Sequence, residues 1–386
     1  MRRALLALLP GLLLAQATVP AFAQTGAPAQ AQETAWPARA RTAVDYLDAQ
    51  WGKPADWNGI EAWQRFVVVD ALLDYQRRTG DRRLHEKVGA AVRNRTGLYL
   101  NDDALWAVIA NIHAWQDDRD PALLDYAATT YKQLVGTYWD DRCGGGLWWN
   151  PARTYKNAIT NELLLYASSQ LFLATGEQGY RDWALRTWNW FEHSSMIGPD
   201  GLVNDGLDAN CRNNGQPYFT YNQGVLLGGL TDLTTITGDA RYRAVAVKTA
   251  IAAARGLSTP EGILREPVPI GSDGLIFKGV FAFHLGHLLD DMAPGPERSE
   301  LTDWVRRNAD AVWRSSASGT RAIGSDWSLD GTLPASAAAQ TSGIAMMLAG
   351  TGMPLPHRDA QVAGKEIPAA KDPAENFSQS LFSPRR

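Results

Sequence analysis

The sequence predicts an all-α fold, an (α/α)6 barrel of six inner and six outer helices. Two observations lead to this fold class. Nearly every periodic segment has the apolar spacing of a helix, and short connections alternate with long ones along the chain. In a ring of helical hairpins, this alternation places all the short turns at one end and all the long loops at the other. The twelve expected helices lie near residues 37–50, 59–78, 84–93, 102–118, 121–137, 157–175, 179–193, 220–236, 240–255, 277–291, 298–315 and 336–349.

The short turns share one pattern. In each, a glycine can take the left-handed position that ends one helix, and an acidic residue begins the next. The near-copies are Thr79-Gly80-Asp81, Thr175-Gly176-Glu177 and Thr237-Gly238-Asp239, and Asp118-Arg119-Asp120-Pro121 does the same with proline at the first helical position. The long connections are rich in Gly, Asn and Trp, and lie at 138–156, 194–219, 256–276 and 316–335, with a shorter example at 94–101.

The even-numbered helices of this series are expected to be the inner ones. The helix at 220–236 contains three glycines, which destabilise an exposed helix but allow backbones to approach closely. The helix at 336–349 is similarly small and apolar, whereas those at 179–193 and 298–315 carry more Arg, Asp and Trp. The long loops therefore lead into the N-termini of inner helices, and we expect binding residues at that end.

The start of the chain is typical of a secretory signal, which we place at residues 1–23. Arg2 and Arg3 precede a short apolar run, and Ala21-Phe22-Ala23 is a cleavage site. No apolar run reaches the ~20 residues needed to span a bilayer. We expect a disordered leader at 24–35, one catalytic domain at 36–352 and a loosely ordered tail at 353–386. The mature protein is then periplasmic or secreted, free of the membrane and monomeric.

The charge and the remaining motifs exclude several classes of function. The formal net charge is −4, and loss of Arg2 and Arg3 makes it more negative, so a nucleic-acid partner is not expected. His284 and His287 share a helix face, but no third metal ligand stands at a convincing spacing. No phosphate-binding loop or nucleophile elbow is present, and no cofactor or metal is expected.

Two cysteines, Cys143 and Cys211, lie in loops rich in Gly and Asn. In an oxidising compartment they can form a disulfide, which in the chain-entropy model would contribute about 4 kcal/mol. Two free thiols are the alternative. The sequence leaves both open.

Two adjacent carboxylates, Asp102 and Asp103, are the candidate catalytic groups. Of four Asp-Asp pairs, only this one starts an inner helix at the long-loop end; the others are Asp117-Asp118, Asp140-Asp141 and Asp290-Asp291. Two carboxyl groups that differ in protonation can act as acid and as nucleophile or base, and the like charge raises one pKa. The alternative is structural: Asn101 as N-cap, followed by acidic residues that the helix dipole stabilises.

Polar and aromatic side chains near the same helix ends are candidates for sugar binding. Trp148 and Trp149, in a Gly-rich loop, offer flat faces for stacking on pyranose rings. Amides and hydroxyls in first helical turns suit sugar hydroxyls, although capping and contacts between helices are the alternative. The candidates are Asn101, Trp148, Trp149, Asn157, Asn161, Glu162, Tyr221, Asn222, Gln223 and Lys278.

Five stretches together resemble glycoside hydrolase family 76, the endo-α-1,6-mannanases and their fungal cell-wall relatives. They are Tyr99-Leu100-Asn101-Asp102-Asp103-Ala104-Leu105-Trp106, Gly144-Gly145-Gly146-Leu147-Trp148-Trp149-Asn150, Tyr155-Lys156-Asn157-Ala158-Ile159-Thr160-Asn161-Glu162-Leu163, Tyr221-Asn222-Gln223-Gly224 and Phe277-Lys278-Gly279-Val280-Phe281. The resemblance implies an (α/α)6 barrel and a retaining mechanism, with Asp102 as nucleophile and Asp103 as general acid/base. Where the family often has an Arg after the last stretch, this chain has Ala282-Phe283-His284, which affects substrate subsites only.

The resulting hypothesis is an exported glycosidase that cuts α-1,6-mannan, or a related polysaccharide, inside the chain. A transglycosylase would use the same residues and differ only in the acceptor. A non-catalytic glycan-binding protein is the alternative from another class, against which the intact Asp pair argues. An (α/α)6 sugar epimerase would need paired catalytic histidines at the barrel mouth, and the sequence does not place any there.

Overall fold

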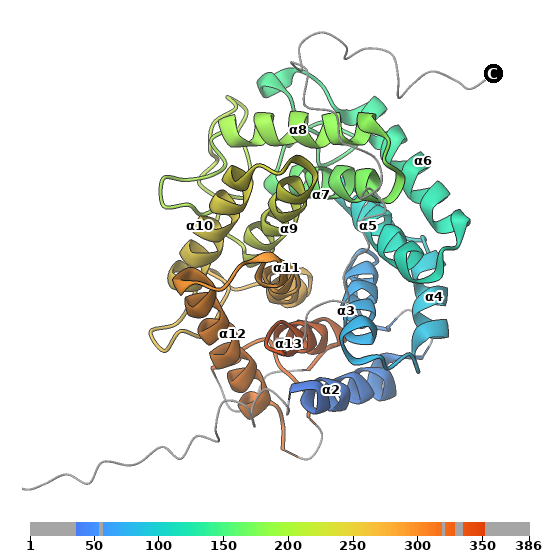
Figure 1. Ribbon diagram of the computed structural model, residues 1–386, viewed down its shortest axis with the longest axis vertical. Helices are drawn as coiled ribbons and strands as arrows, with labels where there is room; N and C mark the ends of the chain where they lie inside the picture. The colour runs from blue at the N-terminus through green and yellow to red at the C-terminus, as the bar shows by residue number, and fades with distance from the viewer. Residues whose placement is uncertain (1–35, 54–56, 319–320, 329–334, 352–386) are drawn as a thin grey trace, which may run out of the picture.

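The computed structural model describes residues 36–53, 57–318, 321–328 and 335–351, and these residues form an all-α barrel (Figure 1). The expected signal, leader and tail lie outside the described residues. The helices are α2 (Trp36–Trp51), α3 (Gln64–Thr79), α4 (His85–Arg93), α5 (Asn101–Asp118), α6 (Pro121–Tyr138), α7 (Ala158–Thr175), α8 (Gln178–His193), α9 (Thr220–Thr237), α10 (Ala240–Gly256), α11 (Phe277–Asp291), α12 (Pro296–Ser315) and α13 (Ala337–Ala349), with short 3-10 helices η1 (Arg142–Gly144) and η2 (Asp273–Ile276).

Each expected helix is present, and the largest error in a boundary is at the start of α3. We expected this helix from residue 59, whereas it begins at Gln64. Trp57 and Gly59 before it have positive φ values of 50° and 83°, which a helix does not allow. The described loop residues form isolated β-bridges and no β-sheet.

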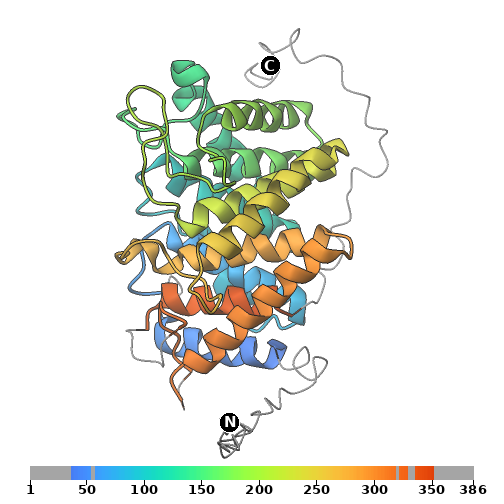
Figure 2. The same cartoon turned by 90° about the vertical axis from the view of Figure 1, so that its left-hand side faces the viewer.

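The inner ring consists of α3, α5, α7, α9, α11 and α13. Each of these helices packs on the next, and α13 packs back on α3, which closes the ring. The helices α2, α4, α6, α8, α10 and α12 lie outside it, so the expected alternation of inner and outer helices is confirmed. Figure 2 shows the long loops gathered at one end of the helices.

Glycines bring the inner helices α9 and α11 into backbone contact. A Cβ atom on Gly224 would lie 2.5 Å from the Cα of Phe281, and one on Gly228 would lie 2.2 Å from Nδ1 of His284. Any larger residue at these positions would force the two helices apart. The glycines of this helix thus serve close packing, as the sequence indicated.

The short turns also form as expected. Gly80, Gly176 and Gly238 end their helices in the left-handed conformation, with φ between 71° and 73°. Arg119 takes the same conformation at the end of α5, with φ of 55°, and Pro121 begins α6. These tight hairpins fix the end of the barrel opposite the long loops.

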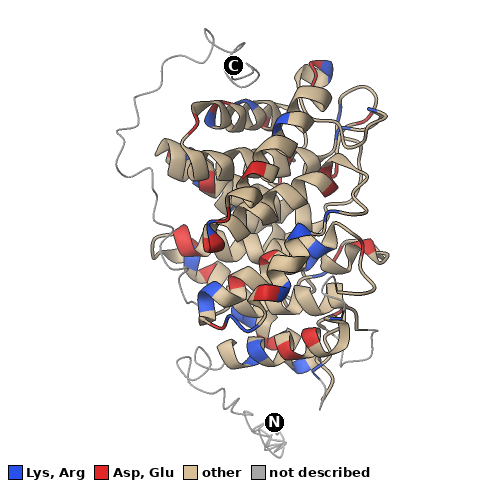
Figure 3. Cartoon of the chain, turned by 90° about the vertical axis from the view of Figure 1, so that its right-hand side faces the viewer, with Lys and Arg blue, Asp and Glu red and all other residues tan. Residues whose placement is uncertain are grey.

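Charged residues of both signs are interspersed over the side of the barrel that Figure 3 shows. The Asp pairs at the short-turn end are part of this pattern: Asp117 pairs with Arg77 at 2.8 Å, and Asp290 pairs with Arg78 at 2.7 Å. These carboxylates hold helix ends together. No helix in the described parts of the chain is long and apolar enough to span a membrane.

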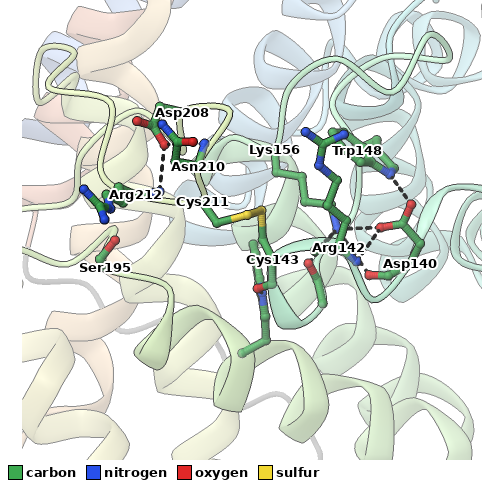
Figure 4. Close-up of a disulfide and its surroundings, with 12 residues drawn as sticks. Asp140, Arg142, Cys143, Trp148, Lys156, Ser195, Asp208, Asn210, Cys211 and Arg212 are labelled. Atoms are coloured by element: carbon green, nitrogen blue, oxygen red, sulfur yellow. Dashed lines mark hydrogen bonds and ion pairs between the residues drawn. A yellow bond between two sulfur atoms is a disulfide. The ribbon is translucent and has the colours of Figure 1, made fainter.

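A disulfide between Cys143 and Cys211 joins two long loops, and this settles the alternative that the sequence left open (Figure 4). The two Cα atoms are 5.2 Å apart. Beside the bridge, the buried ammonium of Lys156 donates to Asp140 Oδ1 at 2.8 Å and to the carbonyl of Gly145 at 2.6 Å. The disulfide and this lysine fix the loops that lead into α7 and α9.

Candidate active site

A cleft with a volume of about 770 Å³ opens at the long-loop end of the barrel. Its walls come from the first turns of inner helices and from the loops that precede them. The lining residues are Glu61, Ala62, Trp63, Gly97, Tyr99, Leu100, Asp102, Asp103, Trp106, Trp149, Tyr155, Asn157, Asp205, Phe219, Tyr221, Val268, Pro269, Ile270, Gly271, Asp273, Gly274 and Phe277. Both candidate catalytic aspartates are therefore in this cleft.

At the start of α5, the side chain of Asp103 caps the helix, whereas that of Asp102 does not. Leu100 is the N-cap, in an extended conformation, and Asp103 Oδ2 accepts the backbone N–H of Tyr99 at 3.0 Å and that of Leu100 at 3.2 Å. The alternative that Asn101 is the N-cap is wrong, because Asn101 is already helical and its side chain donates to the carbonyl of Trp148 at 2.7 Å. Asp103 thus caps its own helix and also faces the cleft.

Asp102 has fewer hydrogen-bond donors around its carboxylate than Asp103 has. Its Oδ1 is buried and has no hydrogen-bond partner. Burial, and then the charge of Asp103, raise the pKa of Asp102 to about 8. Burial also raises the pKa of Asp103, against the two backbone N–H groups that favour its ionised form. Burial thus favours the protonated form of both carboxyl groups.

The cleft contains further carboxylates that the sequence analysis missed. Asp205, in the loop before α9, accepts the hydroxyl of Tyr155 at 2.7 Å and the amide of Asn222 at 3.3 Å, and burial raises its pKa. Asp273 accepts the indole N–H of Trp63 at 2.7 Å. Both lie in long loops that the sequence identified, but neither lies in a helical pattern that would show which way it points.

Aromatic rings form much of the cleft wall. Tyr221 stacks on Phe277 with 3.9 Å between ring centroids and 11° between planes, and Trp63 stacks on Trp106 at 5.6 Å. At the rim, Tyr99 is 81% exposed, which is unusual for a large ring in a folded protein. Such surfaces suit the apolar faces of sugar rings.

The family model described as Glycosyl hydrolase family 76 matches residues 42–353. The chain belongs to glycoside hydrolase family 76. The resemblance seen in the five sequence stretches is thereby confirmed.

Relatives of this family 76 protein include the mannan endo-1,6-alpha-mannosidase DCW1 of Saccharomyces cerevisiae, which is 30% identical over 67% of this chain and 64% of the relative. The protein of the same name from Candida glabrata is 29% identical over 69% of this chain and 67% of the relative. The matched region thus spans about two thirds of the length of these curated relatives.

Solved structures share the fold. The α-1,6-mannanase of a Salegentibacter species superposes with a TM-score of 0.74 at 22% identity, over 82% of this chain and 98% of that chain. Dfg5 from Chaetomium thermophilum, solved in complex with glucosamine, gives a TM-score of 0.69 at 19% identity, over 84% and 91% of the two chains. The (α/α)6 barrel of this family 76 protein is therefore shown.

The structure brings five of the expected site residues together at the cleft: Asp102, Asp103, Trp149, Asn157 and Tyr221. Trp149 and Tyr221 present side chains to the cavity, whereas Asn157 also caps α7 by accepting the N–H of Thr160 at 3.3 Å. A residue at one of these helix starts can therefore line the cleft and cap its helix at the same time.

The other expected residues do not border the cleft. Trp148 is buried, with its indole N–H on Asp140 Oδ2 at 2.7 Å. Asn161 accepts the N–H of Leu147 at 2.7 Å and donates to the carbonyl of the same residue at 3.1 Å. Gln223 binds the N–H and the carbonyl of Val203 in the same way, both at 2.8 Å. These side chains hold the loops that shape the cleft.

Three buried polar residues lie directly behind the cleft wall. Glu162 is fully buried with no hydrogen-bond partner on either oxygen, and burial with the nearby charge of Asp205 raises its pKa far above the ordinary range. Asn222 donates to Asp205, and Lys278 lies against the ring of Trp327 at 3.7 Å. In the described parts of the chain, no group of three or more His, Cys, Asp or Glu residues is arranged to hold a metal ion.

Proposed function

We propose that this chain is an exported endo-acting glycosidase that hydrolyses α-1,6-linked mannan with retention of anomeric configuration. The observation that carries the proposal is the Asp102-Asp103 doublet, two adjacent carboxyl groups with raised pKa values in a cleft walled by aromatic rings. The names of the curated relatives, mannan endo-1,6-alpha-mannosidases, support the substrate class. An inactive variant of the Salegentibacter mannanase, with two consecutive aspartates replaced by asparagine, was solved with α-1,6-mannotriose, which supports the doublet.

The proposed reaction has two displacements. In the first, a carboxylate oxygen of Asp102 attacks the anomeric carbon and forms a glycosyl ester, while the glycosidic oxygen leaves with the proton of Asp103. In the second, Asp103 takes a proton from water, whose oxygen attacks the same carbon and releases Asp102. Each displacement inverts the carbon, so the product keeps the α configuration.

The contacts of the two carboxyl groups fit these roles. Oδ1 of Asp102 has no hydrogen-bond partner, so it is available to form a bond. Backbone N–H groups bind Oδ2 of Asp103, which leaves Oδ1 to carry the proton. In each of the two carboxyl groups, Oδ1 is thus the oxygen atom that is free to react.

The first displacement needs a proton on Asp103 and an ionised Asp102. Burial raises the pKa of both carboxyl groups, which favours a proton on the doublet. Bound substrate favours the required arrangement, because the glycosidic oxygen accepts a hydrogen bond from protonated Asp103 and positive charge at the anomeric carbon stabilises ionised Asp102. The reversed assignment, with Asp102 as acid and Asp103 as nucleophile, would use the same two groups.

Chemical rescue distinguishes the two assignments. If Asp102 is the nucleophile, Asp102→Ala with azide gives the inverted β-mannosyl azide, because the anion attacks directly from the vacated side. Asp103→Ala with azide then gives the α-azide from a substrate with a good leaving group, through the intact glycosyl ester. The opposite pattern would assign the roles the other way round.

The overall activity is tested on linear α-1,6-mannan with NMR detection of the first products. Short oligosaccharides released initially as the α anomer support the proposal, and β anomers indicate inversion. Asp102→Asn and Asp103→Asn should each reduce turnover by orders of magnitude in a folded protein, whereas Asp125→Asn, an exposed residue of α6, should not. Products longer than the substrate would indicate transglycosylation, and binding without turnover would indicate a glycan receptor.

Two structural features support an endo-acting, exported enzyme. The cleft has an exposed rim at Tyr99, where a polymer can extend beyond the doublet. The Cys143–Cys211 disulfide fits an oxidising compartment outside the cytosol. We expect the protein in the periplasm or the medium.

A further inference from the structure

Five carboxyl side chains line the cleft, and its described lining residues include no lysine, arginine or histidine. The five acidic residues are Glu61, Asp102, Asp103, Asp205 and Asp273. They belong to the starts of four inner helices or to the loops before them, so parts of the chain that are far apart in sequence give the cleft a single sign of charge. A cleft lined by one sign of charge concentrates the electrostatic potential that a ligand meets.

The hydrogen-bond donors to these carboxyl groups are neutral. Asp273 accepts the indole N–H of Trp63 at 2.7 Å, and Asp205 accepts the hydroxyl of Tyr155 at 2.7 Å. Two backbone N–H groups bind Asp103. A neutral donor holds a carboxylate in place, but it does not cancel the negative charge.

Ion pairs neutralise many carboxylates elsewhere in the protein. Asp117 pairs with Arg77 at 2.8 Å, and Asp140 pairs with the buried ammonium of Lys156 at 2.8 Å. Within the described part of the chain, none of the five carboxyl groups of the cleft has an ion-pair partner. In addition, Oδ1 of Asp102 is buried without a hydrogen-bond partner. The described groups around the cleft therefore do not balance its charge.

This imbalance affects neutral and anionic ligands differently. Burial raises the pKa of Asp273, and the charges of Glu61 and Asp103 raise it further, as expected where carboxylates repel one another. An anionic group on a sugar would lose hydration here without gaining a counter-ion, and such a juxtaposition of like charges is unfavourable. A neutral sugar hydroxyl can instead donate a hydrogen bond to an ionised carboxylate, which is an acceptor only.

We propose that the cleft selects uncharged mannan and excludes chains that carry anionic ester groups, with Glu61 and Asp273 as specificity-determining residues. The inference narrows the substrate class of the proposed function and rests on it. Glu61 and Asp273 are both exposed, and they lie in the loops before α3 and α11, outside the helix that carries the doublet. Their charges therefore act on substituents of the substrate without belonging to the reacting pair.

The kinetic test compares two forms of α-1,6-mannotetraose. One carries a 6-O-sulfate at its non-reducing end, which stays anionic at every working pH, and the other carries a neutral 6-O-methyl group there. At low salt, kcat/KM should be about 10-fold or more lower for the sulfated form, and about 0.5 M NaCl should narrow this gap several-fold by screening. Equal values, or a gap that salt does not change, would overturn the proposal, because steric exclusion does not depend on salt.

Substitution of the two exposed carboxylates tests their assignment. Glu61→Gln and Asp273→Asn should each raise the ratio of kcat/KM for the sulfated form to that for the methylated form by about 2- to 5-fold at low salt. Asp125→Asn is the matched control, because it removes the same charge from an exposed position on α6, and it should leave the ratio unchanged. An equal rise in the control would mean that net charge, and not the cleft, determines the preference.

A second measurement needs no turnover. Cationic and anionic nitroxides of similar size are compared by how strongly each broadens the NMR signal of the Tyr99 ring, which is exposed at the rim and assigned with Tyr99→Phe. At low salt the cationic nitroxide should broaden this signal several-fold more. Equal broadening would refute the inference even in an active enzyme, whereas a lack of products from the methylated tetraose would refute the proposed function. The two failures are therefore distinguishable.

Discussion

The raised pKa of Asp102 predicts that Asp102→Asn stabilises the protein at alkaline pH. The carboxyl titrates near 3.8 in a flexible chain and near 8 in the folded protein. Because the folded-state pKa is the higher one, the stability that Asp102 contributes is fully present below pH 4 and is lost as the pH rises through 8. Asparagine keeps the shape of the side chain and carries no charge, so the variant does not lose this stability.

The magnitude follows from the difference between the two pKa values. Ionising Asp102 completely costs the folded state up to about 6 kcal/mol relative to the unfolded chain, at about 1.4 kcal/mol for each pH unit. The side chain borders an open cleft, and solvent that enters it would relax part of this cost. We therefore expect the variant to be more stable than the wild type by about 2–4 kcal/mol at pH 9, and nearly equal to it at pH 4.

Urea unfolding at each pH unit from 4 to 9 measures this difference directly. Pairwise subtraction removes the titration of all other groups that the two proteins share. Asp125→Asn, an exposed aspartate of α6, is the matched control, and its effect on the free energy of unfolding should stay small throughout. A difference between Asp102→Asn and wild type that stays constant across the range would refute the reasoning, because it would mean that Asp102 ionises as easily in the cleft as in the unfolded chain.

Other features give shorter predictions. Gly224→Ala should lower the free energy of unfolding by about 1–3 kcal/mol or more, because its Cβ would meet the backbone of Phe281, whereas Gly286→Ala, with ordinary contacts at 3.4 Å, should be neutral or stabilising in thermal melts. Replacing both cysteines by serine should cost about 4 kcal/mol in urea unfolding, since the bridge closes a 68-residue separation. Tyr99→Ala should raise KM for the polymer several-fold with unchanged thermal stability, because the ring is exposed at the cleft rim.

The fold could be predicted because its signals are local and repeated. Each left-handed glycine, such as Gly80 or Gly176, ends a helix by a rule that depends only on its own backbone. The alternation of short and long connections then determines which helices are inner. The start of α3 was misplaced because the segment around Trp57 and Gly59 has positive φ values, and a single apolar pattern does not show such a conformation in advance.

The site was predicted less completely because irregular loops have no period. Trp148 and Trp149 are neighbours of the same type, yet one is buried on Asp140 and the other faces the cleft. Nothing in their shared sequence environment tells which of them faces inward. Asp205 could not be selected for the same reason, although its loop was known to lie at the correct end of the barrel.

The side-chain amides of the inner helices could not be assigned from the sequence for a different reason. Asn161, Gln223 and Gln340 each occupy the fourth position of an inner helix, and each accepts a backbone N–H from the preceding long loop, at 2.7, 2.8 and 2.8 Å. Each amide also donates to backbone carbonyls. A sugar hydroxyl and a peptide group present the same donor and acceptor requirements to an amide, so residue type and position alone could not separate them. Loops that lack regular structure still contain buried peptide groups that must be paired. An amide at this position is thus committed first to its own loop, and the residues left for substrate are those that line the cleft, such as Asp102 and Tyr221.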